Sequence, residues 1–172
     1  MNDYLRHLPN LISVVRIILV GPVVWTLLND RYSAAFWLFV IAGASDGLDG
    51  FLAKRFDWSS RLGGILDALA DKLLLISTFL CLWWLGLFPW WLVLAILARD
   101  LVIVTGGTIY NFRIETVQPQ PSLISKLNTL LQITLAAVGM LHLGFGGIPS
   151  WLVQALVWAV MLTVLSSGFG YV

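Results

Sequence analysis

Residues 33–54 read SAAFWLFVIAGASDGLDGFLAK and residues 61–86 read RLGGILDALADKLLLISTFLCLWWLG, and these two stretches decide the fold. Each is mostly apolar over the length of about 20 residues that a membrane-spanning helix needs. The polar run from Lys54 to Arg61 separates them, so we expect two helices joined by a turn. Each stretch nevertheless carries two aspartates, which are rare in such helices and mark functional sites there.

The rest of the chain repeats the apolar pattern of these two stretches. Four further apolar runs cover residues 8–28, 90–112, 123–143 and 149–169. Hydrophobic residues make up 59% and charged residues only 11%, whereas a soluble domain carries about 25% charge. The sequence therefore predicts one all-α integral membrane domain, residues 1–172, with six transmembrane helices. The net charge of +1 argues against a nucleic-acid partner.

The lysines and arginines orient the predicted bundle. Only Arg31 lies at one end of the predicted helices, and the other nine of the ten basic residues lie at or near the opposite end. The positive-inside rule places that basic end, and both termini, in the cytoplasm, as in a bacterial inner membrane. We expect no cleavable signal peptide before residue 8, and we expect a natural tail to follow Val172.

The four aspartates have the spacing of a shared site. Asp46 and Asp49 are three residues apart, and Asp67 and Asp71 are four apart, so each pair lies on one helical face. In two helices that run side by side from this turn, Asp46 lies at about the same distance from the turn as Asp71, and Asp49 at about the same distance as Asp67. Four converging carboxylates repel one another unless cations neutralise them. Carboxylates without nearby His or Cys favour hard divalent ions, Mg²⁺ or Mn²⁺, and the set is large enough for two.

The stretch from Asp46 to Asp71 resembles the signature of the CDP-alcohol phosphatidyltransferase family. That pattern is D-x2-D-G-x2-A-R-x8-G-x3-D-x3-D. Its glycines and alanine match Gly50, Ala53 and Gly63, and every spacing matches. This sequence differs from the pattern at Lys54, where the family has Arg. The planar guanidinium of Arg can contact a phosphate with two N–H groups at once, whereas the ammonium of Lys is a single point charge.

The resemblance implies an activity and a set of roles. Family members transfer a phosphatidyl group from CDP-diacylglycerol to an alcohol and release CMP, usually as homodimers of six-helix chains. By this resemblance Asp46, Asp49 and Asp67 are metal ligands, and Asp71 is both a metal ligand and the general base. The small residues make room for the nucleotide, and the predicted donor site comprises Gly50, Ala53, Lys54, Arg61 and Gly63.

Three further stretches are similar to the CMP-forming cardiolipin synthases. They are residues 9–16, Ala98-Arg99-Asp100 and residues 121–129. The implied acceptor is phosphatidylglycerol. Phosphatidylglycerophosphate synthases, whose acceptor is glycerol-3-phosphate, share much of this pattern and remain the alternative. They typically carry a second Lys at the position of Asn128, and the neutral Asn128 suits the lower charge of phosphatidylglycerol.

Basic residues at the cytoplasmic end predict the pocket for this anionic acceptor. Arg16, Arg99 and Lys126 come from three different helices, and with Asn128 they make up the predicted acceptor site. The plainer alternatives are snorkelling to the headgroups for Arg16, an interhelical ion pair for Arg99, and a solvated helix start for Lys126. A divalent-cation transporter is a distant alternative function, because it would need acids spread along the depth of the bilayer.

Overall fold

The computed structural model describes the backbone of residues 8–56, 61–113 and 123–169. Side chains are described within these ranges except at 8–10, 46, 48–56, 61–65, 68, 104, 106–113 and 168–169. These ranges form six helices: α1 (Leu8–Leu28), α2 (Tyr32–Phe56), α3 (Arg61–Trp84), α4 (Trp90–Arg113), α5 (Leu123–Phe145) and α6 (Ser150–Phe169). Each predicted helix end lies within two residues of the observed one, so the all-helical prediction is confirmed.

Local backbone chemistry sets where several helices end and begin. Gly86 and Gly146 have φ values of 78° and 64°, a left-handed conformation that glycine adopts without a steric cost. They follow α3 and α5, and Pro89 and Pro149 stand immediately before α4 and α6. Asp30, with φ of 58°, makes the tight connection between α1 and α2. These short connections force neighbouring helices in sequence to run in opposite directions.

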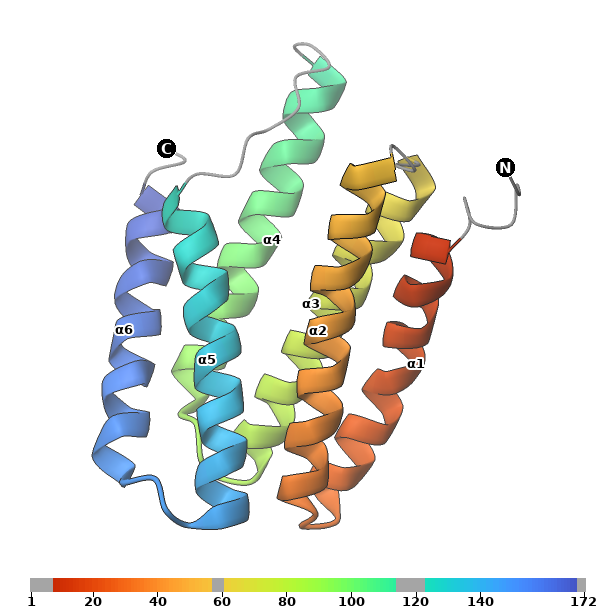
Figure 1. The fold of residues 1–172 in the computed structure, drawn as a ribbon. Helices are drawn as coiled ribbons and strands as arrows, with labels where there is room; N and C mark the ends of the chain where they lie inside the picture. Colours follow the sequence, from red (N-terminus) through yellow and green to blue (C-terminus); the bar gives the residue numbers. More distant parts are fainter. Residues whose placement is uncertain (1–7, 57–60, 114–122, 170–172) are drawn as a thin grey trace.

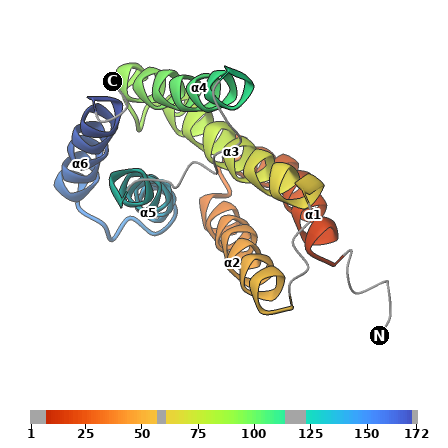
Figure 2. The ribbon, with the colours of Figure 1, turned by 90° about the horizontal axis from the view of Figure 1, so that it is seen from above.

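The six helices form one bundle, with the first three gathered at one side (Figure 1). Seen from above, α1 lies beside α3, α2 lies in front of them, and α5 stands between α2 and α6 (Figure 2). Among the described residues α1 packs extensively against both α2 and α3, whereas α2 and α3 contact each other little. The expected hairpin is therefore held together largely through α1. This arrangement brings side chains of α1 to the aspartates of α3.

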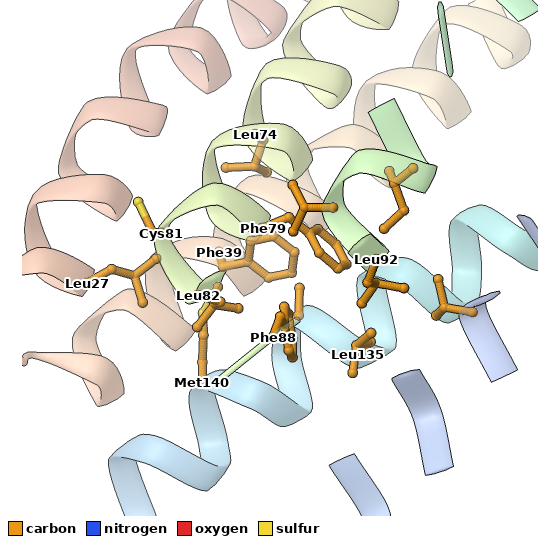
Figure 3. Close-up of a cluster of buried hydrophobic side chains, with 14 of the residues drawn as sticks. Leu27, Phe39, Leu74, Phe79, Cys81, Leu82, Phe88, Leu92, Leu135 and Met140 are labelled. Carbon is orange, nitrogen blue, oxygen red and sulfur yellow. The ribbon is translucent and has the colours of Figure 1, made fainter. Parts of the chain in front are cut away.

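The apolar core lies in the half of the bundle that contains the α1–α2 and α3–α4 connections. Phe79 and Phe88 meet there with ring centroids 5.3 Å apart, and Leu27, Leu82 and Met140 belong to the same buried cluster (Figure 3). These side chains are almost completely buried, and in a membrane their close van der Waals packing, rather than their removal from water, would hold the helices together. The apolar core thus fills one half of the bundle, and most of the charged residues lie in the other half.

The outer surface is apolar in a way that suits lipid rather than water. Large hydrophobic side chains are exposed on all six helices, and exposed patches of that extent mark membrane or protein contacts. Three helices are long and apolar enough to cross a membrane over Leu11–Leu28, Leu123–Phe145 and Ser150–Ser167, by length and composition and among the described residues. The other three helices carry charged residues in the middle of their sequences, which lowers their hydropathy.

Candidate active site

An arginine of α1 and two aspartates of α3 form the centre of the site. Arg16 Nη1 donates to Asp67 Oδ1 at 2.9 Å and to Asp71 Oδ1 at 2.6 Å. The predicted common face of the two aspartates is confirmed, because both carboxylates reach the same nitrogen. The Arg16 side chain is 0% exposed, whereas those of Asp67 and Asp71 are 39% and 43% exposed. Arg16 therefore does not snorkel to the headgroups.

The two carboxylates of this site outnumber its one arginine, so the site favours a further positive charge. Two carboxylate oxygens converge on one cationic nitrogen, and both carboxylates keep a face open to the surroundings. The oxygens are hard ligands of the kind that Mg²⁺ and Mn²⁺ prefer. The residues present therefore fit a divalent cation at Asp67 and Asp71, with Arg16 supplying a fixed charge behind them.

The remaining predicted metal and nucleotide residues lie on helices whose backbone is described. Asp46, Asp49 and three of the predicted donor-site residues belong to the carboxyl-terminal half of α2, and the other two belong to the start of α3. The structure describes only the backbone at Asp46 and Asp49 and at the donor-site positions Gly50, Ala53, Lys54, Arg61 and Gly63. Among the side chains that are described, no group of three or more His, Cys, Asp or Glu could hold a metal. The convergence of four aspartates stays a prediction.

Arg99 is the centre of a second polar group, which joins the last three helices. Its Nε donates to Ser167 Oγ at 3.0 Å, and its Nη2 donates to Ser125 Oγ at 2.7 Å. Its Nη1 donates to Asp100 Oδ1 at 2.9 Å. All three guanidinium nitrogens are thus engaged, and the planar fork is held in one orientation. The carboxylate partner comes from the next residue of α4 itself rather than from another helix.

The other predicted acceptor residues are divided between this group and the surface. Asn128 is fully buried in α5, and its Oδ1 accepts from Thr163 Oγ1 of α6 at 2.9 Å. It lies one turn beyond Ser125, which Arg99 contacts. Lys126 is exposed in the first turn of α5. The structure therefore keeps Arg99 and Asn128 on the α4–α5–α6 side and places Arg16 with the carboxylates of α3.

Sequence reasoning missed one cation of the charged half. Lys72 Nζ lies 3.4 Å from Asp100 Oδ2, so this ion pair links α3 to α4. The signal available in the sequence is that Lys72 directly follows Asp71. Its partner could not be inferred, because the sequence does not say which helix lies beside α3.

An apolar cavity of about 330 Å³ begins at Asp71 and lies between α2, α3 and α5. Phe39, Gly43 and Ala44 line it from α2, and Thr129 and Ile133 line it from α5. Its volume lies within the range of small-molecule sites. A Cβ atom built on Gly43 meets nothing within 4 Å, so the glycine keeps this wall open. One half-exposed carboxylate at a mostly apolar cavity suits a ligand with a polar and an apolar part.

Comparison with known proteins identifies the family. The family model described as CDP-alcohol phosphatidyltransferase matches residues 6–165. The chain belongs to this family. The match contains the Arg16–Asp67–Asp71 centre and, of the Arg99 group, Arg99, Asp100 and Ser125. Family membership therefore supports the resemblance seen in the signature from Asp46 to Asp71.

Individual relatives carry two different names. A chloroplastic CDP-diacylglycerol–glycerol-3-phosphate 3-phosphatidyltransferase 1 of Oryza sativa subsp. japonica is 34% identical over 185 residues, covering 96% of this chain and 56% of that protein. A cardiolipin synthase (CMP-forming) of Rattus norvegicus is 29% identical over 180 residues, covering 95% of this chain and 60% of that protein. A CDP-diacylglycerol–glycerol-3-phosphate 3-phosphatidyltransferase of Aquifex aeolicus is 34% identical over 142 residues, covering 79% and 77%. The chain thus spans little more than half the length of the first two relatives.

Proposed function

We propose that this phosphatidyltransferase moves a phosphatidyl group from CDP-diacylglycerol to phosphatidylglycerol, giving cardiolipin and CMP. The observation that carries the proposal is the pair of carboxylates, Asp67 and Asp71, held on one arginine, with Asp71 also lining an apolar cavity. A phospholipid substrate needs both the carboxylates and the cavity. A divalent cation held by the carboxylates would meet its phosphate, and the cavity would keep its acyl chains out of water.

Asp46, Asp49, Asp67 and Asp71 would hold one or two divalent cations in this reaction. A bound Mg²⁺ or Mn²⁺ supplies charge neutralisation at the transferring phosphate and at the leaving oxygen. The chain's own contribution is a set of carboxylates kept in place before substrate arrives. Arg16 provides part of that preorganisation, since it is buried and contacts two of the four.

Asp71 is the group that we assign to proton transfer. The hydroxyl oxygen of the acceptor attacks the phosphorus that is bonded to diacylglycerol, the bond from that phosphorus to the CMP oxygen breaks, and the hydroxyl proton passes to Asp71. A general base must lie within hydrogen-bond reach of the proton it accepts. Asp71 suits this role because its carboxylate is 43% exposed and lines the cavity.

The cavity is proposed to take an acyl chain of the donor. The phosphorus under attack is bonded to the diacylglycerol, so the donor's acyl chains begin close to the reacting centre. The α5 wall runs from Thr129 to Ala137, which is about 12 Å of helix. This approaches the thickness of one leaflet, about 15 Å of hydrocarbon.

Phosphatidylglycerol is favoured as the acceptor by the neutral Asn128 and by the charge balance around Arg99, where Asp100 offsets part of the positive charge. Glycerol-3-phosphate is the second candidate, because relatives of both names match the chain at similar identity. It carries a dianionic phosphate, which a more basic pocket would suit.

The membrane arrangement is part of the proposal. We infer six membrane-spanning helices with both termini in the cytoplasm, a homodimeric assembly and a site at the cytoplasmic face, as in a bacterial inner membrane. Nine of the ten lysines and arginines lie at or near the end that bears the aspartates, which supports the orientation. The exposed Trp84, Trp90 and Trp151 lie at the opposite end, where aromatic side chains anchor helices at the interface.

Product identification tests the acceptor. The purified full chain in lipid vesicles is given CDP-diacylglycerol and Mg²⁺ with either phosphatidylglycerol or glycerol-3-phosphate, and the lipid product is identified by mass spectrometry. Cardiolipin from phosphatidylglycerol is the expected product. Phosphatidylglycerophosphate formed from glycerol-3-phosphate, with phosphatidylglycerol unused, would overturn the acceptor assignment and leave the transferase assignment intact.

A further inference from the structure

Asp100 is shared between two cations that come from different helices. Its Oδ1 accepts from Arg99 Nη1 at 2.9 Å, and its Oδ2 lies 3.4 Å from Lys72 Nζ. Two cations and one carboxylate leave one positive charge in excess. Intramembrane charges are costly and usually pair with one another, and the neighbouring Arg16–Asp67–Asp71 centre has one negative charge in excess. The two groups together are balanced, and the local excess of positive charge lies on the Lys72–Asp100–Arg99 side.

The two cations differ in how much of each is available to a ligand. The Arg99 side chain is 9% exposed, and its three nitrogens are held by Asp100, Ser125 and Ser167. The Lys72 side chain is 35% exposed, and its ammonium has three hydrogen-bond donors. Asp100 is the partner of Lys72 among the described residues. Lys72 is therefore the accessible cation of the pair, and Arg99 holds the carboxylate that orients it.

Lys72 is the neighbour of Asp71 along α3, although successive side chains of a helix do not face each other. It directly follows Asp71 on α3, and neighbouring Cα atoms are about 3.8 Å apart. A lysine carries its charge on a flexible four-carbon stem, so the ammonium has the reach to meet a ligand beside Asp71. The Asp100 contact restricts that flexibility by holding the ammonium toward α4.

We infer that Lys72 binds the phosphate of the acceptor headgroup beside Asp71, and that Asp100 is a positioning residue that sets how much negative charge the acceptor site accepts. The inference rests on the proposed transferase function. With Asp100 ionised, the Lys72–Asp100–Arg99 group carries one excess positive charge, which matches the single negative charge of a phosphodiester headgroup. Without the carboxylate, the same group would carry two, which matches a phosphate monoester.

Lys72→Met tests the binding role, because it keeps an unbranched stem and removes the ammonium. We expect the KM for phosphatidylglycerol to rise about 10- to 100-fold, as for the loss of one charged hydrogen bond, while kcat falls less than the KM rises. Lys72→Arg should recover most of the loss. The matched control is Arg31→Met, which removes an exposed cation at the opposite end of the bundle, where Arg31 stacks on Trp25 at 5.4 Å, and should leave the KM unchanged.

Asp100→Asn tests the selectivity role, because it keeps the shape and removes the negative charge. We expect the ratio of kcat/KM for glycerol-3-phosphate to that for phosphatidylglycerol to rise by about tenfold, from added attraction to a dianion. A purely structural ion pair gives a different result. Both Lys72→Met and Asp100→Asn would then lower the melting temperature and leave the acceptor KM and this ratio unchanged, and the inference would be wrong.

A binding measurement separates this inference from the proposed reaction. Calorimetry with short-chain, water-soluble phosphatidylglycerol and no donor reports on the acceptor site without turnover. Weaker binding to the Lys72→Met variant than to the Arg31→Met variant supports the inference even if the wild-type protein proves unable to transfer a phosphatidyl group. Equal binding to the two variants overturns it even if the wild-type protein makes cardiolipin.

Discussion

Replacing Arg16 by Met should destabilise the protein and make its stability depend on divalent cations. The change keeps most of the buried stem and removes the charge that lies 2.9 Å and 2.6 Å from two carboxylates. Removing one partner of a fully buried ion pair costs about 3–5 kcal/mol. Because Asp67 and Asp71 are 39% and 43% exposed, solvent screens part of their repulsion, and we expect about 2 kcal/mol.

Thermal unfolding of the purified protein in detergent measures this effect. For a chain of this size a loss of about 2 kcal/mol lowers the melting temperature by roughly 4–8 °C. Mg²⁺ should then raise the melting temperature of the Arg16→Met variant more than that of the wild type, because a ligand that binds the folded state stabilises it. The cation would replace the charge that the substitution removed.

Two controls make this result interpretable. NaCl at the same ionic strength separates binding of Mg²⁺ from general screening, and Arg31→Met removes a cation from the other end of the bundle. If Arg16→Met is as stable as Arg31→Met without Mg²⁺, the contacts of Arg16 with Asp67 and Asp71 do not stabilise the fold, and the prediction is wrong. It is also refuted if Mg²⁺ restores no more stability than NaCl does, because Asp67 and Asp71 would then not form a divalent-cation site.

Three further predictions concern turnover. Asp71→Asn should lower kcat by about 10²–10⁴ because it removes the carboxylate that we propose as the proton acceptor; near-normal turnover would assign the proton elsewhere. Gly43→Leu fills the cavity without a clash at its Cβ, and should lower kcat/KM for a long-chain donor about tenfold more than for a dihexanoyl donor. Gly21→Leu, at another unobstructed glycine, should leave the two donors equally used, as would Gly43→Leu if the cavity holds no acyl chain. Asn128→Lys places an extra cation at a fully buried position one turn from the Arg99 contact, and in protein that keeps the wild-type melting temperature it should weaken use of phosphatidylglycerol relative to glycerol-3-phosphate; an unchanged ratio of the two kcat/KM values in that folded variant contradicts the acceptor assignment.

Helix positions and spacing within one helix could be predicted from the sequence. Gly86, Pro89 and Pro149 mark connections by their own backbone chemistry, independent of the rest of the fold. The four-residue spacing of Asp67 and Asp71 fixes a common helical face, and both carboxylates do meet one nitrogen of Arg16. These predictions depend only on neighbours along the chain.

Contacts between helices could not be predicted in the same way. The sequence indicated that Arg16 lies at the same end of the bundle as the aspartates, but not that α1 packs against α3 and carries Arg16 to them. Lys72 was missed for the same reason, since its partner Asp100 lies on α4. The burial of Asn128 against Thr163 likewise depends on the packing of α5 on α6. The contacts of a side chain inside the bundle depend on which helices lie beside its own. The spacing of residues along one helix does not specify those neighbours.

We propose that the carboxylate site transfers a phosphatidyl group to an alcohol. The most direct test counts CMP released and new phosphodiester lipid formed by the full chain in vesicles with CDP-diacylglycerol and Mg²⁺, with and without phosphatidylglycerol. We expect one CMP for each cardiolipin, little CMP without the acceptor, and loss of both products in Asp71→Asn. CMP released without a new lipid, or a wild-type protein that forms neither product from phosphatidylglycerol or glycerol-3-phosphate, would contradict this proposal.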